Sequence, residues 1–438
     1  MEYHLRRSLL RFLSWLLPRG DFARNVSILT TGTAVTQVLL AAASPLVTRL
    51  YTPSDMGMFA VFGSVVGVCG GLACLRYDAA IPQPRSLEMA VNVLALSLVI
   101  LPATGLVATF VVALAGRSIA DLLRVPDIAP YLWLVPLSVV LNGAYFAFNS
   151  WFVREGGFAI MARTKFIQAS TQLGIQLGSG VLAASPWGLC VGSVVGRSAG
   201  VGAFFVRFIG VHRSLLRCVK VSTVVDVAGR YWRFPLISSW AATINSIGMQ
   251  APVLMLTALY GPQVAGWYAV AELIIGLPLG MVSGAVDEVY LGETARLIHV
   301  DSASLPRRFK ALSLRLVVTL LPMGLVGAAL SLWVVPVLFG ASWRNAGIYA
   351  AILAVRRCAG AISTAVSNLL LFGYNTWMCG WEILRLVLAV ASIWLCGQGD
   401  LPPVVAIVSL AATSTLAYVV LYVLNWVAVN RVAAVGPG

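Results

Sequence analysis

Long apolar stretches alternate with short polar segments along the whole chain. Many exceed the ~20 residues that a helix needs to cross ~30 Å of hydrocarbon. They are too long for the roughly ten-residue alternating strands of a membrane barrel. Because hydrocarbon satisfies no backbone hydrogen bonds, the pattern predicts an all-α polytopic membrane protein of about 12 transmembrane helices. The expected spans are 26–48, 57–75, 88–115, 131–153, 164–184, 187–207, 234–258, 266–286, 311–336, 346–371, 374–396 and 402–427.

Charge sets the expected orientation of these spans. Charged residues make up only 11% of the chain, and the net charge is +14. With the N-terminus inside, 22 basic residues fall on inner segments and 4 on outer segments. That asymmetry follows the positive-inside rule and predicts that both termini are cytoplasmic. In a membrane protein, this excess of basic residues does not indicate nucleic-acid binding. Residues 1–24 are expected to form an amphipathic helix that lies in the interface between membrane and water.

The chain repeats itself at an offset of 209 residues. The segment 48–71 aligns with 257–280, and the text LYTPSDMGMFAV matches LYGPQVAGWYAV. Pro53 and Gly57 fall on Pro262 and Gly266. Short turns rich in proline and glycine could also resemble each other by chance. The match continues into a span, so we expect two six-helix bundles, at 25–230 and 231–438, related by a pseudo-two-fold repeat around a central site.

Motifs of soluble catalysis are missing from the sequence. No phosphate-binding loop, HExxH or GxSxG segment occurs, and the seven cysteines form no CxxC pair. The three histidines lie outside the spans. We therefore expect no enzyme, no cofactor and no metal site.

Charged residues inside the spans are the candidate functional groups. A charge near the bilayer centre costs ~3 kcal/mol or more, so it normally faces a cavity or a partner. Four arginines against two glutamates leave an excess of positive charge, which favours an anionic substrate because arginine matches phosphate geometry. The residues expected to bind this substrate are Arg197, Arg356, Arg357 and Arg385. The residues expected to couple its transport to an ion gradient are Glu272 and Glu382.

Two of these features also have a structural interpretation. Glu382 and Arg385 are one helical turn apart and could form a buried ion pair. Gln168, Gln172 and Gln176 recur on one helical face. They either line a wet lumen or bond to a neighbouring helix. We include them in the expected substrate site.

Three segments resemble a known family. They are YTPSDMGMFAVF at 51–62, LRYDAAIPQP at 75–84 and LFGASWRNAGIYAAILA at 338–354. The first two are similar to loop motifs of bacterial oligosaccharide flippases of the Wzx type, in the multidrug/oligosaccharidyl-lipid/polysaccharide exporter superfamily. The third resembles the segment that opens the family's tenth span. The chain departs from the second motif by lacking the Leu-Pro that often follows it.

The resemblance implies a function and partners. Such proteins move an undecaprenyl-diphosphate-linked oligosaccharide across the bacterial inner membrane, for O-antigen, capsule or exopolysaccharide assembly. The implied partners are this lipid-linked oligosaccharide, membrane lipid and the polysaccharide polymerase machinery. A multidrug or cation antiporter of the same superfamily is one alternative, but it would favour acidic cavity residues. A membrane polymerase or ligase is another, but it would need a larger outer loop than this chain has.

Overall fold

The computed structural model describes residues 21–435, apart from the side chains of residues 21–31, 288, 299 and 435. Most of the interfacial helix expected over residues 1–24 lies outside this range. The first half consists of α2 (Asp21–Leu50), α3 (Pro53–Gly70), α4 (Leu87–Leu122), α5 (Ala129–Leu132), α6 (Val135–Arg154), α7 (Phe158–Ala183), α8 (Pro186–His212) and α9 (Val221–Arg230). The second consists of α10 (Ser239–Tyr260), α11 (Pro262–Val300), α12 (Leu305–Phe339), α13 (Arg344–Ala365), α14 (Asn375–Gln398) and α15 (Pro403–Val435).

The described helices confirm the predicted fold class. Ten of them are long and apolar enough to cross a membrane. Residues 126–132 and α6, with a bend of 50° between them, make an eleventh if the pair is counted as one span. The expected span 164–184 falls on α7, which carries the three glutamines and is not among these candidates, so the structure supports ten or eleven of the twelve predicted spans. Large apolar side chains such as Leu106 and Trp333 stay exposed on α4 and α12, as expected of faces that contact lipid.

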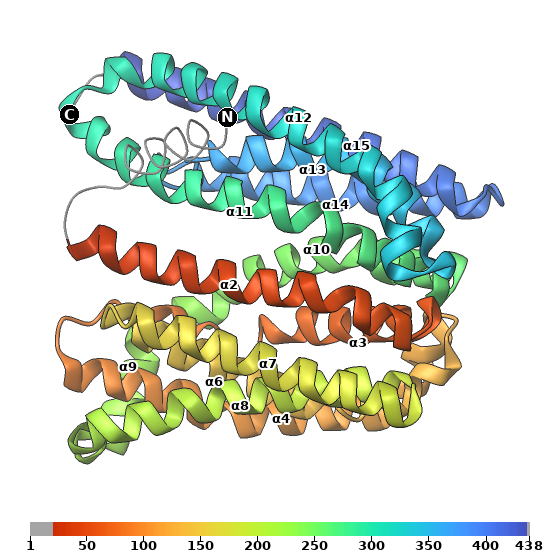
Figure 1. The fold of residues 1–438 in the computed structure, drawn as a ribbon. Helices are drawn as coiled ribbons and strands as arrows, with labels where there is room; N and C mark the ends of the chain where they lie inside the picture. The colour runs from red at the N-terminus through yellow and green to blue at the C-terminus, as the bar shows by residue number, and fades with distance from the viewer. Residues whose placement is uncertain (1–20, 436–438) are drawn as a thin grey trace, which may run out of the picture.

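Each half has a core of its own. One buried cluster runs from Met58 to Val227 and another from Leu256 to Val429. In the first half α7 packs on both α2 and α8, and in the second α13 packs on α11, α12 and α15. Figure 1 shows the two bundles, with α2–α9 in the lower part and α10–α15 in the upper part.

The segment that connects the bundles is fastened to the first one. Asn92 of α4 donates to the carbonyl of Cys218 and accepts from the amide of Lys220. The hydroxyl of Tyr77 donates to the carbonyl of Ala228 in α9. A domain boundary between residues 230 and 231 stays a prediction from the sequence.

Equivalent loops of the repeat start α3 and α11 at the same end of the molecule. Thr52 and Asp55 form a reciprocal capping box, and Pro53 occupies the first turn of α3, where its missing N–H costs nothing. Before α11, Gly261 adopts a φ of +86°, which favours glycine, and Pro262 takes the first turn. Each helix therefore begins abruptly, and both first turns lie at the boundary between the bundles, since α3 packs on α11.

The bundles meet backbone to backbone at two glycines of the repeat. A Cβ atom added at Gly57 would overlap the carbonyl oxygen of Pro262, and one added at Gly266 would overlap that of Pro53. The two contacts are exchanged by the 209-residue repeat, as a self-complementary contact about a two-fold axis requires. Residues shared by the two copies therefore build the contact between the copies.

Polar contacts reinforce this end. Arg49, in the last turn of α2, donates to the carbonyls of Leu338 at 2.9 Å and Val337 at 3.1 Å, in the last turn of α12. The indole of Trp343 donates to the carbonyl of Thr48 at 2.9 Å. All three bonds join the first half to the second. We call this end of the molecule, which holds the first turns of α3 and α11, the sealed end, and the opposite one the open end.

Replacing Gly57 or Gly266 by alanine is expected to loosen the sealed end, because each new Cβ displaces a carbonyl of the other bundle. The cost should be about 1–3 kcal/mol for either variant, as for other overpacked sites. The opening of the sealed end is measured by the rate of thiol labelling at Val270→Cys, a buried position, in a protein whose own cysteines are replaced. Matched controls are Gly63→Ala in α3 and Gly280→Ala in α11, where an added Cβ meets nothing within 4 Å. Equal labelling of all four variants would contradict the assignment.

Candidate functional site

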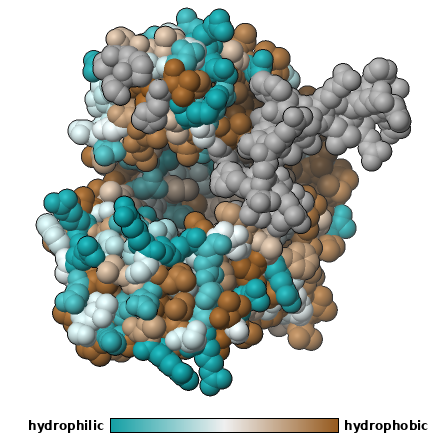
Figure 2. All heavy atoms as spheres, turned by 90° about the vertical axis from the view of Figure 1, so that its left-hand side faces the viewer, coloured by the Kyte–Doolittle hydropathy of each residue, from teal (hydrophilic) through white to brown (hydrophobic). Residues whose placement is uncertain are grey.

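A cavity of about 600 Å³ lies between the two bundles. Its walls come from α3, α6, α7 and α8 of the first half and from α10 of the second, and it extends to the turn after α3. Figure 2, seen from the open end, shows a hollow between the halves with hydrophilic residues inside it. Glycines make up part of the α3 wall: a Cβ at Gly63 or Gly70 would meet nothing within 4 Å. The small residues of α3 thus leave space for a ligand.

Arg197 of α8 lines this cavity. Its Nη1 donates to Oε1 of Gln168 at 3.3 Å, and its guanidinium lies 4.8 Å from the centre of the Tyr145 ring. In the described part of the chain, no carboxylate lies within ion-pair distance of Arg197. Its neighbours are polar but neutral, so Arg197 keeps its attraction for an anion that enters the cavity.

The three glutamines on one face of α7 do not share one role: two line the cavity, and one bonds to a neighbouring helix. Gln168 and Gln172 line the cavity. Gln176 lies deeper and is buried, and its amide donates to the carbonyl of Leu189 at 3.1 Å. The stripe as a whole packs on the α8 glycines Gly192, Gly196 and Gly200, where added Cβ atoms would meet Gln176, Gln172 and Gln168 in turn. One face of α7 therefore joins α8 and also presents two amides to the cavity.

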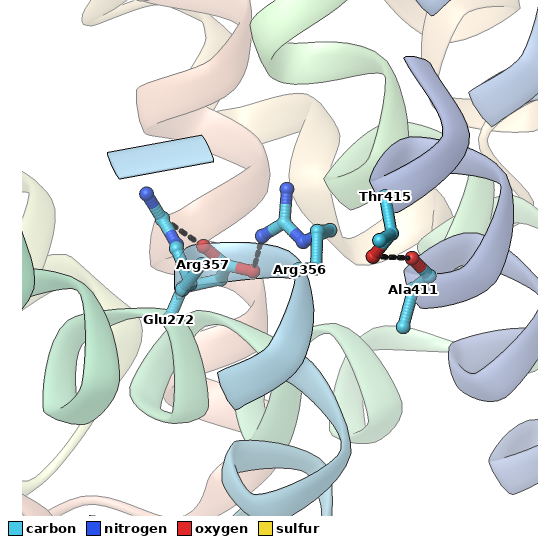
Figure 3. A network of polar contacts seen from close by, with 5 residues as sticks. All are labelled: Glu272, Arg356, Arg357, Ala411 and Thr415. Carbon is cyan, nitrogen blue, oxygen red and sulfur yellow. Dashed lines mark hydrogen bonds and ion pairs between the residues drawn. The ribbon is translucent and has the colours of Figure 1, made fainter. Parts of the chain in front are cut away.

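Glu272, Arg356 and Arg357 form one ion cluster in the second bundle. Each arginine donates through Nη2 to a different oxygen of the Glu272 carboxylate. Figure 3 shows the carboxylate of α11 between the two guanidinium groups of α13. The Arg357 side chain is 40% exposed, whereas those of Arg356 and Glu272 are 11% and 13% exposed. Adjacent arginines can thus share one acid although their directions on the helix diverge.

Glu382 and Arg385 of α14 form the ion pair that their spacing allows, at 2.6 Å. The side-chain amide of Asn245 in α10 donates to the other oxygen of Glu382. Asn245 itself lines the cavity. The Arg385 guanidinium also lies 5.0 Å from the centre of the Trp381 ring. This pair is therefore one side chain removed from the cavity.

The ion pairs determine which arginines carry the excess positive charge. Glu382 balances Arg385, and Glu272 balances one of its two arginines, so one charge remains on that cluster and one on Arg197. Of the four predicted arginines, Arg197 is the one that lines the cavity. Within the described residues, no group of His, Cys, Asp and Glu could hold a metal ion.

Arg76 and Asp78 also line the cavity, at its open end. They belong to the LRYDAAIP segment, and Arg76 Nη1 lies 4.0 Å from Asp78 Oδ2. Burial raises the pKa of the Asp78 carboxyl, while the Arg76 charge and hydrogen bonds from backbone amides act in the opposite direction. The prediction from charges inside spans did not include Arg76 and Asp78, because both follow the second span. Both belong to the LRYDAAIPQP motif, which was the signal in the sequence that could have identified them.

Glu272→Gln is expected to destabilise the protein strongly, because it leaves two partly buried arginines without their shared acid. Loss of one partner of a buried ion pair costs about 3–5 kcal/mol. Arg357→Ala should cost much less, since that side chain is 40% exposed and Arg356 keeps its acid. Thermal unfolding in detergent measures both. The control is Glu293→Gln, which breaks an exposed pair with Arg308 and should cost about 1 kcal/mol or less. A Glu272 variant as stable as this control would contradict the prediction.

Comparison with known proteins identifies the family and the fold. Residues 46–348 match the family described as "Polysaccharide biosynthesis protein", and a search of curated proteins found no match. The structure resembles the lipid II flippase MurJ in an inward closed conformation, with a TM-score of 0.69, 12% identity, and 93% of this chain and 90% of that chain covered.

It also resembles an inward-facing multidrug resistance MATE transporter of the MOP superfamily. Here the TM-score is 0.59 at 13% identity, over 94% of this chain and 99% of that chain. These likenesses show the fold, and the family match confirms the resemblance inferred from the sequence motifs. The chain therefore belongs to the polysaccharide biosynthesis protein family and has the fold shared by MATE transporters and MurJ.

Proposed function

We propose that this protein is a flippase that moves undecaprenyl-diphosphate-linked oligosaccharide across the bacterial inner membrane for surface polysaccharide synthesis. The observation that carries the proposal is Arg197, a cation without a carboxylate partner among the described residues, in a cavity between two bundles. A diphosphate supplies the counter-charge, and Gln168, Gln172 and Asn142 supply amides for sugar hydroxyls at the same walls. The family match to polysaccharide biosynthesis proteins supports the class of cargo.

The mechanism that we propose is alternating access. The cavity takes up its substrate from the cytoplasmic side, to which the basic segments of the open end assign it. The bundles then rock about the central site, which parts Gly57 from Pro262 and Gly266 from Pro53. Binding of the anion shifts the equilibrium between the two conformations only if its affinity for one differs from its affinity for the other.

The ion-paired residues have proposed roles of a second kind. Arg357, being the more exposed member of its cluster, adds a cation for the substrate as it crosses, with Arg356 beside it. Arg385 and Glu382 reach the cavity through Asn245. Glu382 and Glu272 are the proposed coupling residues, because each holds arginines whose release would link transport to an ion gradient.

Multidrug or cation antiport is the alternative that the MATE likeness raises. A cationic cargo needs a carboxylate in the cavity. Among the described lining residues that group is Asp78, which faces Arg76. The balance of charge therefore favours an anionic cargo. A polymerase or ligase differs from both in where its substrate collects, and the following experiment separates these classes.

Cells that lack this protein are expected to accumulate finished lipid-linked oligosaccharide on the inner leaflet. Leaflet-resolved labelling of the sugar measures this. A polymerase or ligase would instead leave finished units on the outer leaflet, and an antiporter would leave their distribution unchanged. Either of these results would contradict the proposed function.

Complementation with Arg197→Ala is expected to fail although the variant inserts normally. One charge-assisted contact is worth about 1.5–3 kcal/mol, so export should fall about tenfold or more. The control is Arg117→Ala, which removes an exposed arginine of α4 outside the cavity. Full export by the Arg197 variant would remove this residue from the site.

A further inference from the structure

The chain makes an unusual turn directly after α3. Leu75 and Arg76 are consecutive residues with φ values of 49° and 60°. This left-handed region is unfavourable for residues that carry a Cβ. Neither residue is glycine, asparagine or aspartate, which tolerate such angles best. Strain of this kind persists where the surroundings impose it, and it is concentrated at functional sites.

Three anchors hold the turn in place. The Thr104 hydroxyl donates to the carbonyl of Ala73 at 3.0 Å, and the Cys74 thiol donates to the carbonyl of Gly143 at 3.2 Å. On the other side, Tyr77 is buried and bonded to Ala228. The residues flanking the turn are therefore fixed on α4, α6 and α9, and the left-handed turn directs the intervening Arg76 to the mouth of the cavity.

The guanidinium of Arg76 is incompletely satisfied there. Its Nε is buried, and no described group accepts a hydrogen bond from it. Its Nη1 is 4.0 Å from Asp78, the outer limit for an ion pair, and its side chain is 38% exposed. Asp78 meanwhile receives hydrogen bonds from backbone amides. If this turn served only to bury Asp78, a closer pair would be expected; the arginine instead keeps donors available to an incoming anion.

We propose that Arg76 is an anion-binding residue at the open end of the cavity, which receives the substrate's diphosphate before it reaches Arg197. The inference rests on the proposed function and adds an entry site to it. Both arginines line one cavity. Arg76 follows the end of α3, whereas Arg197 lies within α8, so the anion meets Arg76 first. The strained turn fixes an arginine whose flexible side chain would otherwise sample the surrounding water.

A pair of glycine substitutions tests this role. Arg76→Gly removes the guanidinium and also relieves the backbone strain, because glycine adopts positive φ freely. The matched control is Arg124→Gly, since Arg124 is an exposed arginine with a φ of 53° that does not line the cavity. Neither variant should lower the thermal midpoint. Arg76→Gln provides a second test, because it removes the charge and keeps a polar side chain that can donate hydrogen bonds.

Binding is measured on the full-length protein in nanodiscs, with undecaprenyl diphosphate as the probe and inorganic pyrophosphate in a parallel arm. Arg76→Gly and Arg76→Gln should slow association of the lipid about tenfold, the effect of one lost charge-assisted contact. Arg124→Gly should leave it unchanged. Pyrophosphate should compete with the lipid in the wild type and compete less well in the Arg76 variants.

The outcomes separate this inference from the proposed function. Wild-type association in both Arg76 variants, together with lost affinity in Arg197→Ala, would overturn the entry site and leave the flippase proposal standing. Equal slowing by Arg124→Gly would assign the effect to general surface charge and overturn the entry site as well. A wild-type protein that binds no undecaprenyl diphosphate would overturn both proposals.

Discussion

The arrangement of this protein depends on one close contact, in which the backbone of each bundle touches that of the other where α3 and α11 begin. Gly57 lies on the carbonyl of Pro262, and Gly266 lies on that of Pro53. Contacts between small residues let helix backbones approach, and in a membrane such packing replaces the hydrophobic driving force. Because the two contacts are equivalent, they close one end of the molecule symmetrically, whereas the hollow between the halves is seen from the open end (Figure 2).

The cavity owes its chemistry to charges that differ in how well they are balanced. All three arginines of the clusters around Glu272 and Glu382 are ion-paired. The first cluster joins α11 to α13, and the Asn245–Glu382 hydrogen bond joins α10 to α14. Among the described residues, Arg197 contacts the amide of Gln168 and the ring of Tyr145 and forms no ion pair. In the proposed mechanism an anionic cargo is drawn to the first bundle, while the second supplies polar contacts through α10.

The sequence predicted more of the fold than of the site. Hydropathy was sufficient for the fold class, a polytopic helical protein, because it follows from long apolar stretches of the chain. The repeat also marked Gly57 and Gly266 as equivalent, although not that they contact the opposite copy. Side-chain partners depend on helix rotation, so neither the sharing of Glu272 nor the burial of Gln176 could be predicted. Arg76 was overlooked because it lies after the second span, and its place at the cavity depends on a turn that the sequence does not reveal.

Paired distance measurements can show whether the two ends of the molecule close alternately. Spin labels at Ser54 and Gln263, which are equivalent positions of the repeat, report on the sealed end. Labels at Gln83 and Arg307 report on the open end. Double electron–electron resonance should detect two populations, in each of which a longer distance at one end accompanies a shorter distance at the other. Lipid-linked oligosaccharide should change the ratio of the two populations. Distances that vary independently, or a sealed end that never opens, would contradict the account.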